Sequence, residues 1–191
     1  MYETLEGRKI RLRKAREEDT LSMLENVWGD EAVYRWMLFP PTLTPEDALE
    51  RCRRSIEYQK DHLAYFVALV DTDEAIGLCA VKEDTPGHFE ESGIGIGKKH
   101  QGKGFGKEIL SLLLNLSFQL GAKDFRYGYF RENEPSKKLA ESFGFHYEKT
   151  YELTRPWDGA VKTIDSCILT RKEYLELSAA GMIPNSDLPP V

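Results

Sequence analysis

The sequence predicts an α+β protein whose central sheet is mixed but mostly antiparallel and is flanked by helices. Three observations carry this prediction. Segments in which apolar and polar residues alternate, as in strands, are interleaved with segments of helical periodicity. Consecutive strands are joined by short turns, which implies antiparallel neighbours. One strand–helix–strand unit near the middle of the chain implies a parallel pair with a right-handed crossover.

The bulk composition is that of one soluble domain. The chain has 191 residues, of which 41% are hydrophobic and 30% are charged, and this length supplies a substantial core. We expect a single domain over residues 1–180 and an irregular tail over 181–191. No apolar run approaches the ~18 residues of a membrane span, and the N-terminus lacks the apolar core of a signal peptide. The expected location is therefore cytoplasmic, with no membrane partner.

Charge and cysteine usage argue against further classes of partner. The net charge is −6 and the isoelectric point is near 5.4, which argues against nucleic acid as a partner. The basic cluster Arg51–Arg54 is expected to be an exposed helix face. Cys52, Cys79 and Cys167 are far apart and form no CxxC pattern, so we predict reduced core thiols and no metal site.

The first half of the chain predicts helices between strands, followed by a hairpin. Thr44 is a good N-cap, and Pro45 suits the first position of the helix that follows it. The expected elements are a strand at 9–13, a helix at 16–27, a short helix from Asp30 to Trp36, a helix from Pro45 to about residue 60, and strands at 63–70 and 75–83.

The segment after this hairpin combines a strand, a glycine-rich turn and a long helix. Residues 91–97 alternate, with glycines on one face, and glycines there indicate that another group approaches the backbone closely. The turn over 101–106 opens a helix that extends to Leu120. Glycines at a helix start leave backbone N–H groups unpaired and convergent, which suits a phosphate, and Lys103 and Lys107 add positive charge.

The last third of the chain predicts a strand, a helix, a hairpin and a closing helix. The dipeptide Asp158-Gly159 is a strong hairpin signal, because both residues tolerate positive φ. The expected elements are a strand at 125–130, a helix at 134–143, strands at 145–155 and 161–170, and a helix at 171–180.

Gln101, Gly104 and Gly106 form the spaced pattern Gln/Arg-x-x-Gly-x-Gly/Ala. This pattern resembles the acyl-CoA pyrophosphate motif of the GNAT superfamily, the acyl-CoA-dependent N-acyltransferases, and its strand–turn–helix context strengthens the resemblance. A glycine-rich connection that is packed for structural reasons is the alternative. A dinucleotide-binding fold is disfavoured, because the motif begins far from the N-terminus and no acidic residue ends a following strand.

The order of elements is also similar to that of this superfamily, from about Leu5 to Leu175. Within it the chain most resembles the Rim-type branch, which includes the ribosomal-protein N-terminal acetyltransferases. The similar stretches are Leu5–Arg13 with Glu18-Asp19, Glu91-x-Gly93, Gln101–Gly104, and Asn133-x-x-Ser136 followed by Gly144-Phe145. The resemblance implies a GNAT-like fold with splayed central strands and acetyl-CoA as co-substrate.

The resemblance assigns acetyl-CoA to the central strand and to the glycine-rich turn. The pantetheine arm is expected between the splayed strands, bonded to backbone groups of the central strand, and the pyrophosphate on the amides of the turn. Asn133 either contacts the CoA arm, as in the family, or caps a helix. The implied cofactor-binding residues are Ile94, Gly95, Ile96, Gln101, Gly102, Lys103, Gly104, Phe105, Gly106, Lys107 and Asn133.

The resemblance also implies direct attack of a primary amine on the thioester, through a tetrahedral intermediate. Many relatives carry a tyrosine acid in the helix after Asn133, where this chain has Ala140, so Ser136 becomes the candidate acid for the departing thiolate. Glu91 is the first candidate base, directly or through a water. Each has a structural alternative: Ser136 as a plain first-turn residue and Glu91 as an exposed strand-end charge. The other candidate bases are Glu90, His88 and Asp158.

The acceptor amine is expected at the least family-like parts of the chain, residues 28–44 and 157–159. A lysine amine with a pKa of ~10.4 is only about one part in a thousand neutral at pH ~7.5, whereas an α-amine with a pKa of ~7.7–8.0 is about a third neutral. A weakly defined base therefore favours a protein N-terminal α-amine as acceptor. The candidate substrate residues are Trp36, Phe39, Glu90, Trp157 and Asp158.

Other functions and assemblies stay open at this point. Polyamines and aminoglycosides are acceptors that the same scaffold serves, since fold alone does not fix substrate. A binding module that holds acyl-CoA without turnover also fits the turn. Ala140 favours that module, and Ser136 and Glu91 favour the enzyme. We also keep a homodimer among the partner hypotheses.

Overall fold

The computed structural model describes residues 2–183, and its strands form a mixed sheet in the order β1-β2-β3-β4-β5-β6-β8-β7. The pair β5–β6 is parallel, whereas β1–β2, β2–β3, β3–β4, β6–β8 and β7–β8 are antiparallel. The predicted fold class is confirmed. From residue 184 onward, the tail predicted over 181–191 lies outside the described residues.

The chain divides into two compact units, one of residues 1–80 and 92–110 and the other of residues 81–91 and 111–191. Three elements have residues in both units. These elements are β4 (Ala75–Thr85), β5 (His88–Ile96) and α4 (Phe105–Gln119).

The strands of the first unit are β1 (Thr4–Glu6), β2 (Ile10–Arg13), β3 (Ala64–Leu69), the start of β4 and the end of β5. The sequence analysis missed β1, because three residues are too few to show alternation. Gly7 turns the chain from β1 into β2, with its amide donating to the carbonyl of Ile10 at 2.9 Å. The carboxylate of Glu108 accepts from the amide of Lys9 at 2.8 Å, so the first turn of α4 holds this connection in place.

The helices of the first unit are η1 (Glu17–Asp19), α1 (Thr20–Met23), η2 (Leu24–Trp28), α2 (Glu31–Tyr34) and α3 (Pro45–Asp61). A single helix over 16–27 was expected, and the stretch instead passes from a 3₁₀ turn through one α turn to a π turn. Apolar spacing alone does not distinguish these windings. Thr44 caps α3 as predicted, accepting from the amide of Asp47 at 3.2 Å.

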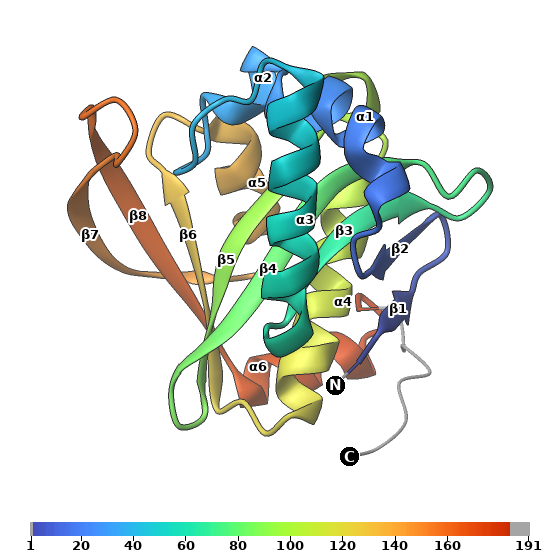
Figure 1. Ribbon diagram of the computed structural model, residues 1–191. Coiled ribbons are helices and arrows are strands. Elements are labelled where there is room, and N and C mark those ends of the chain that lie inside the picture. The colour runs from blue at the N-terminus through green and yellow to red at the C-terminus, as the bar shows by residue number, and fades with distance from the viewer. Residues whose placement is uncertain (1, 184–191) are drawn as a thin grey trace. The chain divides into compact units, whose positions relative to one another are not determined.

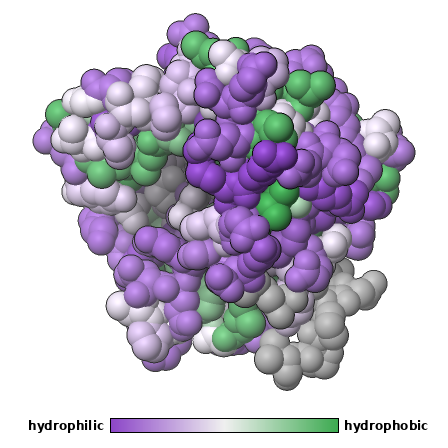
Figure 2. Space-filling view, viewed as in Figure 1, coloured by the Kyte–Doolittle hydropathy of each residue, from purple (hydrophilic) through white to green (hydrophobic). Residues whose placement is uncertain are grey.

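The core of the first unit forms where α3 packs on β3 (Figure 1). Trp28 and Phe66 meet edge to face with ring centroids 5.8 Å apart, and Met23, Val27 and Cys52 are fully buried beside them. The outer face of α3 is charged, and hydrophilic residues cover most of the surface seen in Figure 2. None of the described helices is long and apolar enough to cross a membrane.

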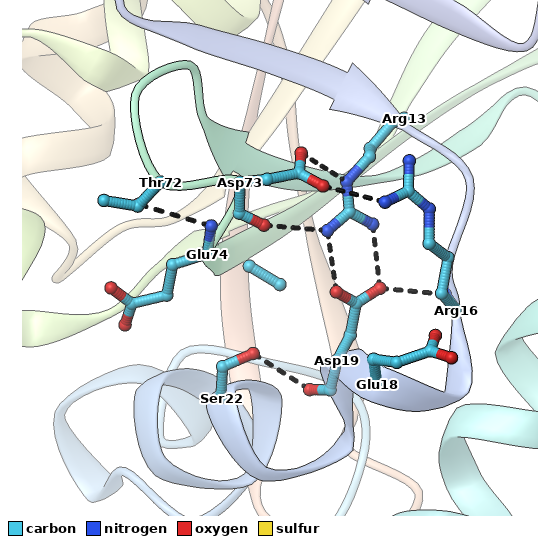
Figure 3. Close-up of a pocket in the computed structure, with 9 residues that line it drawn as sticks. Arg13, Arg16, Glu18, Asp19, Ser22, Thr72, Asp73 and Glu74 are labelled. Atoms are coloured by element: carbon cyan, nitrogen blue, oxygen red, sulfur yellow. Dashed lines mark hydrogen bonds and ion pairs between the residues drawn. The ribbon is translucent and has the colours of Figure 1, made fainter.

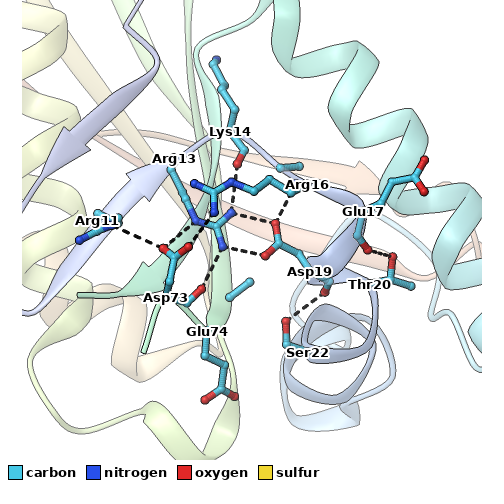
Figure 4. Close-up of polar contacts among 12 residues, drawn as sticks. Arg11, Arg13, Lys14, Arg16, Glu17, Asp19, Thr20, Ser22, Asp73 and Glu74 are labelled. Atoms are coloured by element: carbon cyan, nitrogen blue, oxygen red, sulfur yellow. Dashed lines mark hydrogen bonds and ion pairs between the residues drawn. The ribbon is translucent and has the colours of Figure 1, made fainter. Parts of the chain in front are cut away.

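A buried ion cluster ties β2 to the β3–β4 turn in the first unit (Figures 3 and 4). Arg13 is only 2% exposed and Asp19 only 5%. The guanidinium of Arg13 donates to both carboxylate oxygens of Asp19, at 2.8 and 2.7 Å. It also donates to the carboxylate and the carbonyl of Asp73, each at 3.0 Å. The charged groups of Arg13, Asp19 and Asp73 therefore satisfy one another, and we interpret the cluster as structural.

The second unit is built on the antiparallel strands β6 (Asp124–Phe130), β8 (Val161–Thr170) and β7 (His146–Thr154), which lie side by side in Figure 1. The predicted hairpin of β7 and β8 is confirmed. The helices of this unit are α5 (Glu134–Ser142) and α6 (Arg171–Ala179). Its core includes Phe125 and Phe145, whose rings meet edge to face at 6.2 Å.

The parallel pairing of β5 with β6 joins residues 88–90 to residues 124–126. The strand β5 begins at His88, ahead of the predicted start at Glu91, because its pairing with β6 already includes residues 88–90. Gly87 has a φ of 85°, and its carbonyl accepts from the amide of Lys123 at 2.7 Å.

Candidate active site

The glycine-rich turn is tied to the end of β5 within the first unit. The side-chain amide of Gln101 donates to the carbonyl of Ile96 at 2.9 Å. A short 3₁₀ turn, η3 (Lys98–His100), links the strand to the glycines, and its His100 amide donates to the carbonyl of Gly97 at 2.8 Å. The side chain of Gln101 therefore fixes the start of the turn to the end of β5.

The turn presents backbone amides that the helix itself does not use. The hydrogen bond from the amide of Glu108 to the carbonyl of Gly104, at 3.3 Å, begins the α4 ladder, so the amides just before Glu108 have no acceptor inside the helix. These amides carry the positive end of the helix dipole. Lys103 and Lys107 are exposed beside them. This arrangement fits an anionic pyrophosphate.

Two glycines of the turn are required by backbone conformation and leave open space. Gly102 has a φ of 75° and Gly104 a φ of 87°, a region that other residues adopt only at a cost. A Cβ built on either glycine would meet nothing within 4 Å. The space in front of the turn is therefore open for a ligand that approaches the backbone.

Gly95 in β5 and Gly97 just after it are closely approached by the chain itself. A Cβ at Gly95 would lie 2.5 Å from the terminal carbon of Met37, and one at Gly97 would lie 2.8 Å from the carbonyl oxygen of Asn26. The predicted close approach is thus confirmed at Gly95 and Gly97, by groups from residues 26–37, whereas a Cβ at Gly93 would meet only a carbon of Leu78 at 3.9 Å. The stretch in which we expect the acceptor is therefore packed directly on the strand in which we expect the pantetheine arm.

Arg51 organises the segment that contains Trp36 and Phe39. Its guanidinium lies 4.1 Å from the ring centroid of Phe39 and 5.1 Å from that of Trp28. It donates to the carbonyl of Pro40 at 3.0 Å and to the hydroxyl of Thr42 at 2.8 Å. Burial lowers the pKa of Arg51 to about 10. The expectation of an exposed face at 51–54 is therefore wrong for Arg51, because aromatic rings of its own unit cover it.

Trp36 and Phe39 are both half-buried within this segment. The guanidinium of Arg35 stacks on the ring of Trp36 with 4.7 Å to its centroid. Leu38 and Leu43 are 47% and 72% exposed, so the segment offers apolar surface as well as aromatic rings.

Ser136 stands in the first turn of α5 within the second unit. Its hydroxyl oxygen lies 2.9 Å from the hydroxyl oxygen of Tyr127 on β6. Its amide donates to the side-chain oxygen of Asn133 at 3.3 Å. Asn133 is therefore the N-cap of α5, one of the two roles left open by the sequence, and its contact with CoA stays a prediction.

Tyr127, the hydroxyl partner of Ser136, also lies within the electrostatic influence of Glu91 in the second unit. Tyr127 is only 3% exposed, and burial is the main cause that raises the pKa of its phenol. The charge of Glu91 raises this pKa further, whereas the hydrogen bond with Ser136 lowers it. The phenol thus stays protonated at neutral pH. Sequence reasoning missed Tyr127, although the alternation of β6 places it on one face with Phe125.

The other predicted acidic residues already have cationic partners. Glu90 pairs with Lys82 at 2.7 Å. Asp158 accepts from Nε of Arg155 at 2.8 Å, and this hydrogen bond is the main cause that lowers the pKa of Asp158 to about 2. Arg155 also stacks on Trp157, with 4.2 Å to the ring centroid. At the hairpin tip, Arg155 thus pairs with Asp158 and stacks on Trp157, so the tip is not an open anionic patch.

His88 is half-buried and also has an acidic partner. Its Nδ1 lies 2.7 Å from Asp124 on the paired strand. This pairing gives His88 a structural role at the start of β5.

Comparison with known proteins places this arrangement in context. The model of the acetyltransferase (GNAT) domain matches residues 9–146. The uncharacterized N-acetyltransferase p20 of Bacillus licheniformis is 29% identical over 181 residues, which cover 90% of this chain and 98% of that protein.

Solved structures show the same fold. A GCN5-related N-acetyltransferase from Brucella melitensis superposes with a TM-score of 0.80 at 22% identity, over 94% of this chain and 83% of that one. An acetyl transferase from Salmonella typhimurium that modifies the N-terminal serine of a 50S ribosomal subunit protein superposes with a TM-score of 0.69 at 16% identity, over 86% and 96%.

Proposed function

Because the chain belongs to the GNAT acetyltransferase family, we propose that it transfers the acetyl group of acetyl-CoA to the α-amine of a protein N-terminus. The observation that carries the use of acetyl-CoA is the glycine-rich turn, residues 101–106. Its amides are free of the α4 ladder, its glycines leave open space, and Gln101 fixes it to β5. Preorganised backbone donors suit a pyrophosphate, because they need no rearrangement when the anion binds.

The proposed reaction divides the proton transfers between Glu91 and Ser136. The neutral amine attacks the thioester carbonyl, and a nitrogen–carbon bond forms. As the tetrahedral intermediate collapses, the carbon–sulfur bond breaks and its electron pair goes to sulfur. The sulfur takes a proton from the hydroxyl of Ser136, and the nitrogen loses a proton to Glu91, directly or through a water. Solvent then returns both residues to their starting states.

The acidic groups of the second unit favour a monocationic acceptor over a polyamine. A polyamine carries several positive charges, and a site for it is expected to present unpaired carboxylates. Glu90 and Asp158, the predicted acidic substrate residues, are each paired with a basic side chain. An N-terminal α-amine carries one charge and is already partly neutral near pH ~7.5, so it needs neither a cluster of acids nor a strong base.

The similarity to an enzyme that modifies a protein N-terminus supports the same choice. The Salmonella typhimurium acetyl transferase acts on an N-terminal serine, and the Rim-type sequence features point to the same class of acceptor. In this chain Trp36, Phe39 and the exposed Leu38 would contact the first side chains of such a peptide.

A sensor that binds acyl-CoA without turnover is the second candidate. The observation that favours it is Ala140, which stands where many relatives have a catalytic tyrosine. A sensor and an enzyme both bind CoA, but only the enzyme releases free CoA steadily when an amine is present.

A thiol-release assay with acetyl-CoA against a panel of amines tests the proposal. The panel contains peptides with free N-termini, the same peptides with blocked N-termini, polyamines, aminoglycosides and amino acids. We expect release with the free peptides and none above background with the blocked ones. Stabilisation by CoA in a thermal shift assay without release from any amine would favour the sensor. Failure of CoA to stabilise the protein would contradict the assignment of the turn.

A further inference from the structure

Ser136 has a hydroxyl partner that no sequence motif contains. Tyr127 reaches it from β6, with the two oxygens 2.9 Å apart, and the tyrosine is almost fully buried. The chain thus lacks a phenol at Ala140 but brings one to the start of α5 from a neighbouring strand.

We propose that Tyr127 is a positioning residue that donates a hydrogen bond to Ser136 and so directs the serine proton toward the leaving thiolate. This inference rests on the proposed function.

The chemistry of the two hydroxyls decides which of them donates. A buried phenol needs an acceptor for its proton, and the oxygen of Ser136, a half-buried residue, lies 2.9 Å from it. Burial and the charge of Glu91 keep the Tyr127 phenol protonated, so its proton is available at neutral pH. When Tyr127 donates to the Ser136 oxygen, the serine's own proton is free to point elsewhere.

The hydrogen bond gains strength during the step in which it is needed. As the carbon–sulfur bond breaks, the electron pair goes to sulfur and the sulfur takes the Ser136 proton. Negative charge develops on the serine oxygen at that moment, and a donor fixed 2.9 Å away stabilises it. Solvent then returns a proton to Ser136, and Tyr127 never loses its own.

Both partners are held in place by contacts that do not involve a substrate. The ring of Tyr127 packs against Phe145, with centroids 5.9 Å apart, and its strand pairs with β8 along its whole length. Ser136 is fixed at the start of α5 by the Asn133 cap. The pair is therefore preorganised, which is the condition under which one hydrogen bond affects a rate.

The variant Tyr127→Phe tests this inference, with Tyr129→Phe as the matched control. Tyr129 lies on the same strand, but its hydroxyl accepts from the thiol of Cys167 at 3.9 Å, whereas Tyr127 is the tyrosine that bonds to Ser136. We expect Tyr127→Phe to lower kcat by about 10-fold, the effect of one hydrogen bond of ordinary strength. The KM and Kd for acetyl-CoA and the melting temperature should change little. Tyr129→Phe should leave kcat within about twofold of the wild type.

A double variant separates positioning from a general loss of structure. If Tyr127 acts through Ser136, then Tyr127→Phe in a Ser136→Ala background should cost nothing further in kcat. Multiplicative losses, or a Tyr127→Phe enzyme as fast as the wild type, would overturn the inference and leave the proposed function standing. A wild-type protein that turns over no amine would overturn the proposed function and this inference with it.

Discussion

The glycine-rich turn and the group of Ser136, Tyr127 and Glu91 (the Ser136 cluster) use different chemical groups. The turn offers backbone amides at the start of α4, and its side chains serve mainly to brace it, as Gln101 does by bonding to Ile96. The cluster instead depends on side chains: Tyr127 of β6 reaches the hydroxyl of Ser136 in α5, and the charge of Glu91 on β5 raises the pKa of the buried Tyr127 phenol. Binding thus depends on local backbone shape, whereas proton transfer depends on tertiary packing. Substitutions in the two regions should accordingly change different kinetic constants.

Ser136→Ala should have the largest effect of the substitutions considered below. Loss of a general acid typically costs between about 10²- and 10⁴-fold in rate, and we expect kcat to fall by about 10²-fold with the Kd for acetyl-CoA unchanged. Ser142→Ala is the control, because Ser142 lies in the same helix. Its hydroxyl donates to the carbonyl of Leu139, within that helix. An equal loss in both variants would show that the helix, rather than the Ser136 hydroxyl, matters.

Gly104→Ala should show the opposite pattern and weaken binding. The new Cβ enters the open space in front of the turn and strains a backbone with positive φ. We expect the Kd for acetyl-CoA, measured by calorimetry, to rise by about 10-fold, which is about 1.4 kcal/mol. The control is Gly121→Ala, since Gly121 also has a positive φ, 97°, and its Cβ would also meet nothing within 4 Å.

The two glycine variants should therefore lose similar stability and differ in affinity. Unchanged affinity in a folded Gly104→Ala protein would contradict the assignment of the pyrophosphate to this turn.

Arg51→Ala should act on the acceptor and not on acetyl-CoA. Without the guanidinium, Phe39 loses its stacking partner and the carbonyl of Pro40 loses its donor, so the segment before α3 becomes less ordered. We expect a rise of about three- to tenfold in the KM for a peptide acceptor, from the loss of roughly 1 kcal/mol of positioning. Arg54→Ala is the control, because Arg54 lies on the exposed face of the same helix and pairs with Glu50; exposed pairs of this kind contribute little.

Asp73→Asn should have the smallest effect, a loss of stability that is present at neutral pH and disappears as the pH falls. Burial opposes ionisation of Asp73, but its bonds to Arg13 and Arg16 outweigh that cost and lower its pKa. Its contribution is therefore present above the unfolded pKa of ~3.9 and is lost as the pH falls through the lower folded value. The carboxylate is partly exposed, so we expect about 1 kcal/mol or less.

Urea unfolding at pH values from about 7 down to 3 measures this contribution. The difference between the wild type and Asp73→Asn should shrink as the pH falls. A difference that is constant across this range would show that charge is not its source.

The features predicted from the sequence are those fixed by local patterning. Alternation located β3, β4, β7 and β8, Thr44 and Pro45 located the start of α3, and the Asp158-Gly159 turn located the second hairpin. The glycine spacing of residues 101–106 pointed to a turn with free amides, because positive φ at Gly102 and Gly104 is a backbone property that glycine reveals.

The features that the sequence hid are those decided by packing. Arg51 looked like part of a basic surface, yet the rings of Trp28 and Phe39 cover it. Asp158 looked available to a cation, yet Arg155 folds back on it. In the sequence Tyr127 is an ordinary strand residue, and only the packing of α5 shows that its hydroxyl contacts Ser136. The partners of Arg51 and Tyr127 lie on other elements, and that of Asp158 depends on how the hairpin tip folds, so periodicity does not report them.

The location of the acetyl group on a peptide product decides between the acceptors. A peptide with a free N-terminal α-amine and one internal lysine is incubated with the protein and acetyl-CoA, and fragmentation by mass spectrometry locates the modification. We predict acetylation at the α-amine, with the lysine unmodified and with loss of the product in Ser136→Ala. Acetylation at the lysine alone would contradict the proposed function. So would a peptide that stays unmodified although the protein binds acetyl-CoA and the acetyl-CoA is not consumed.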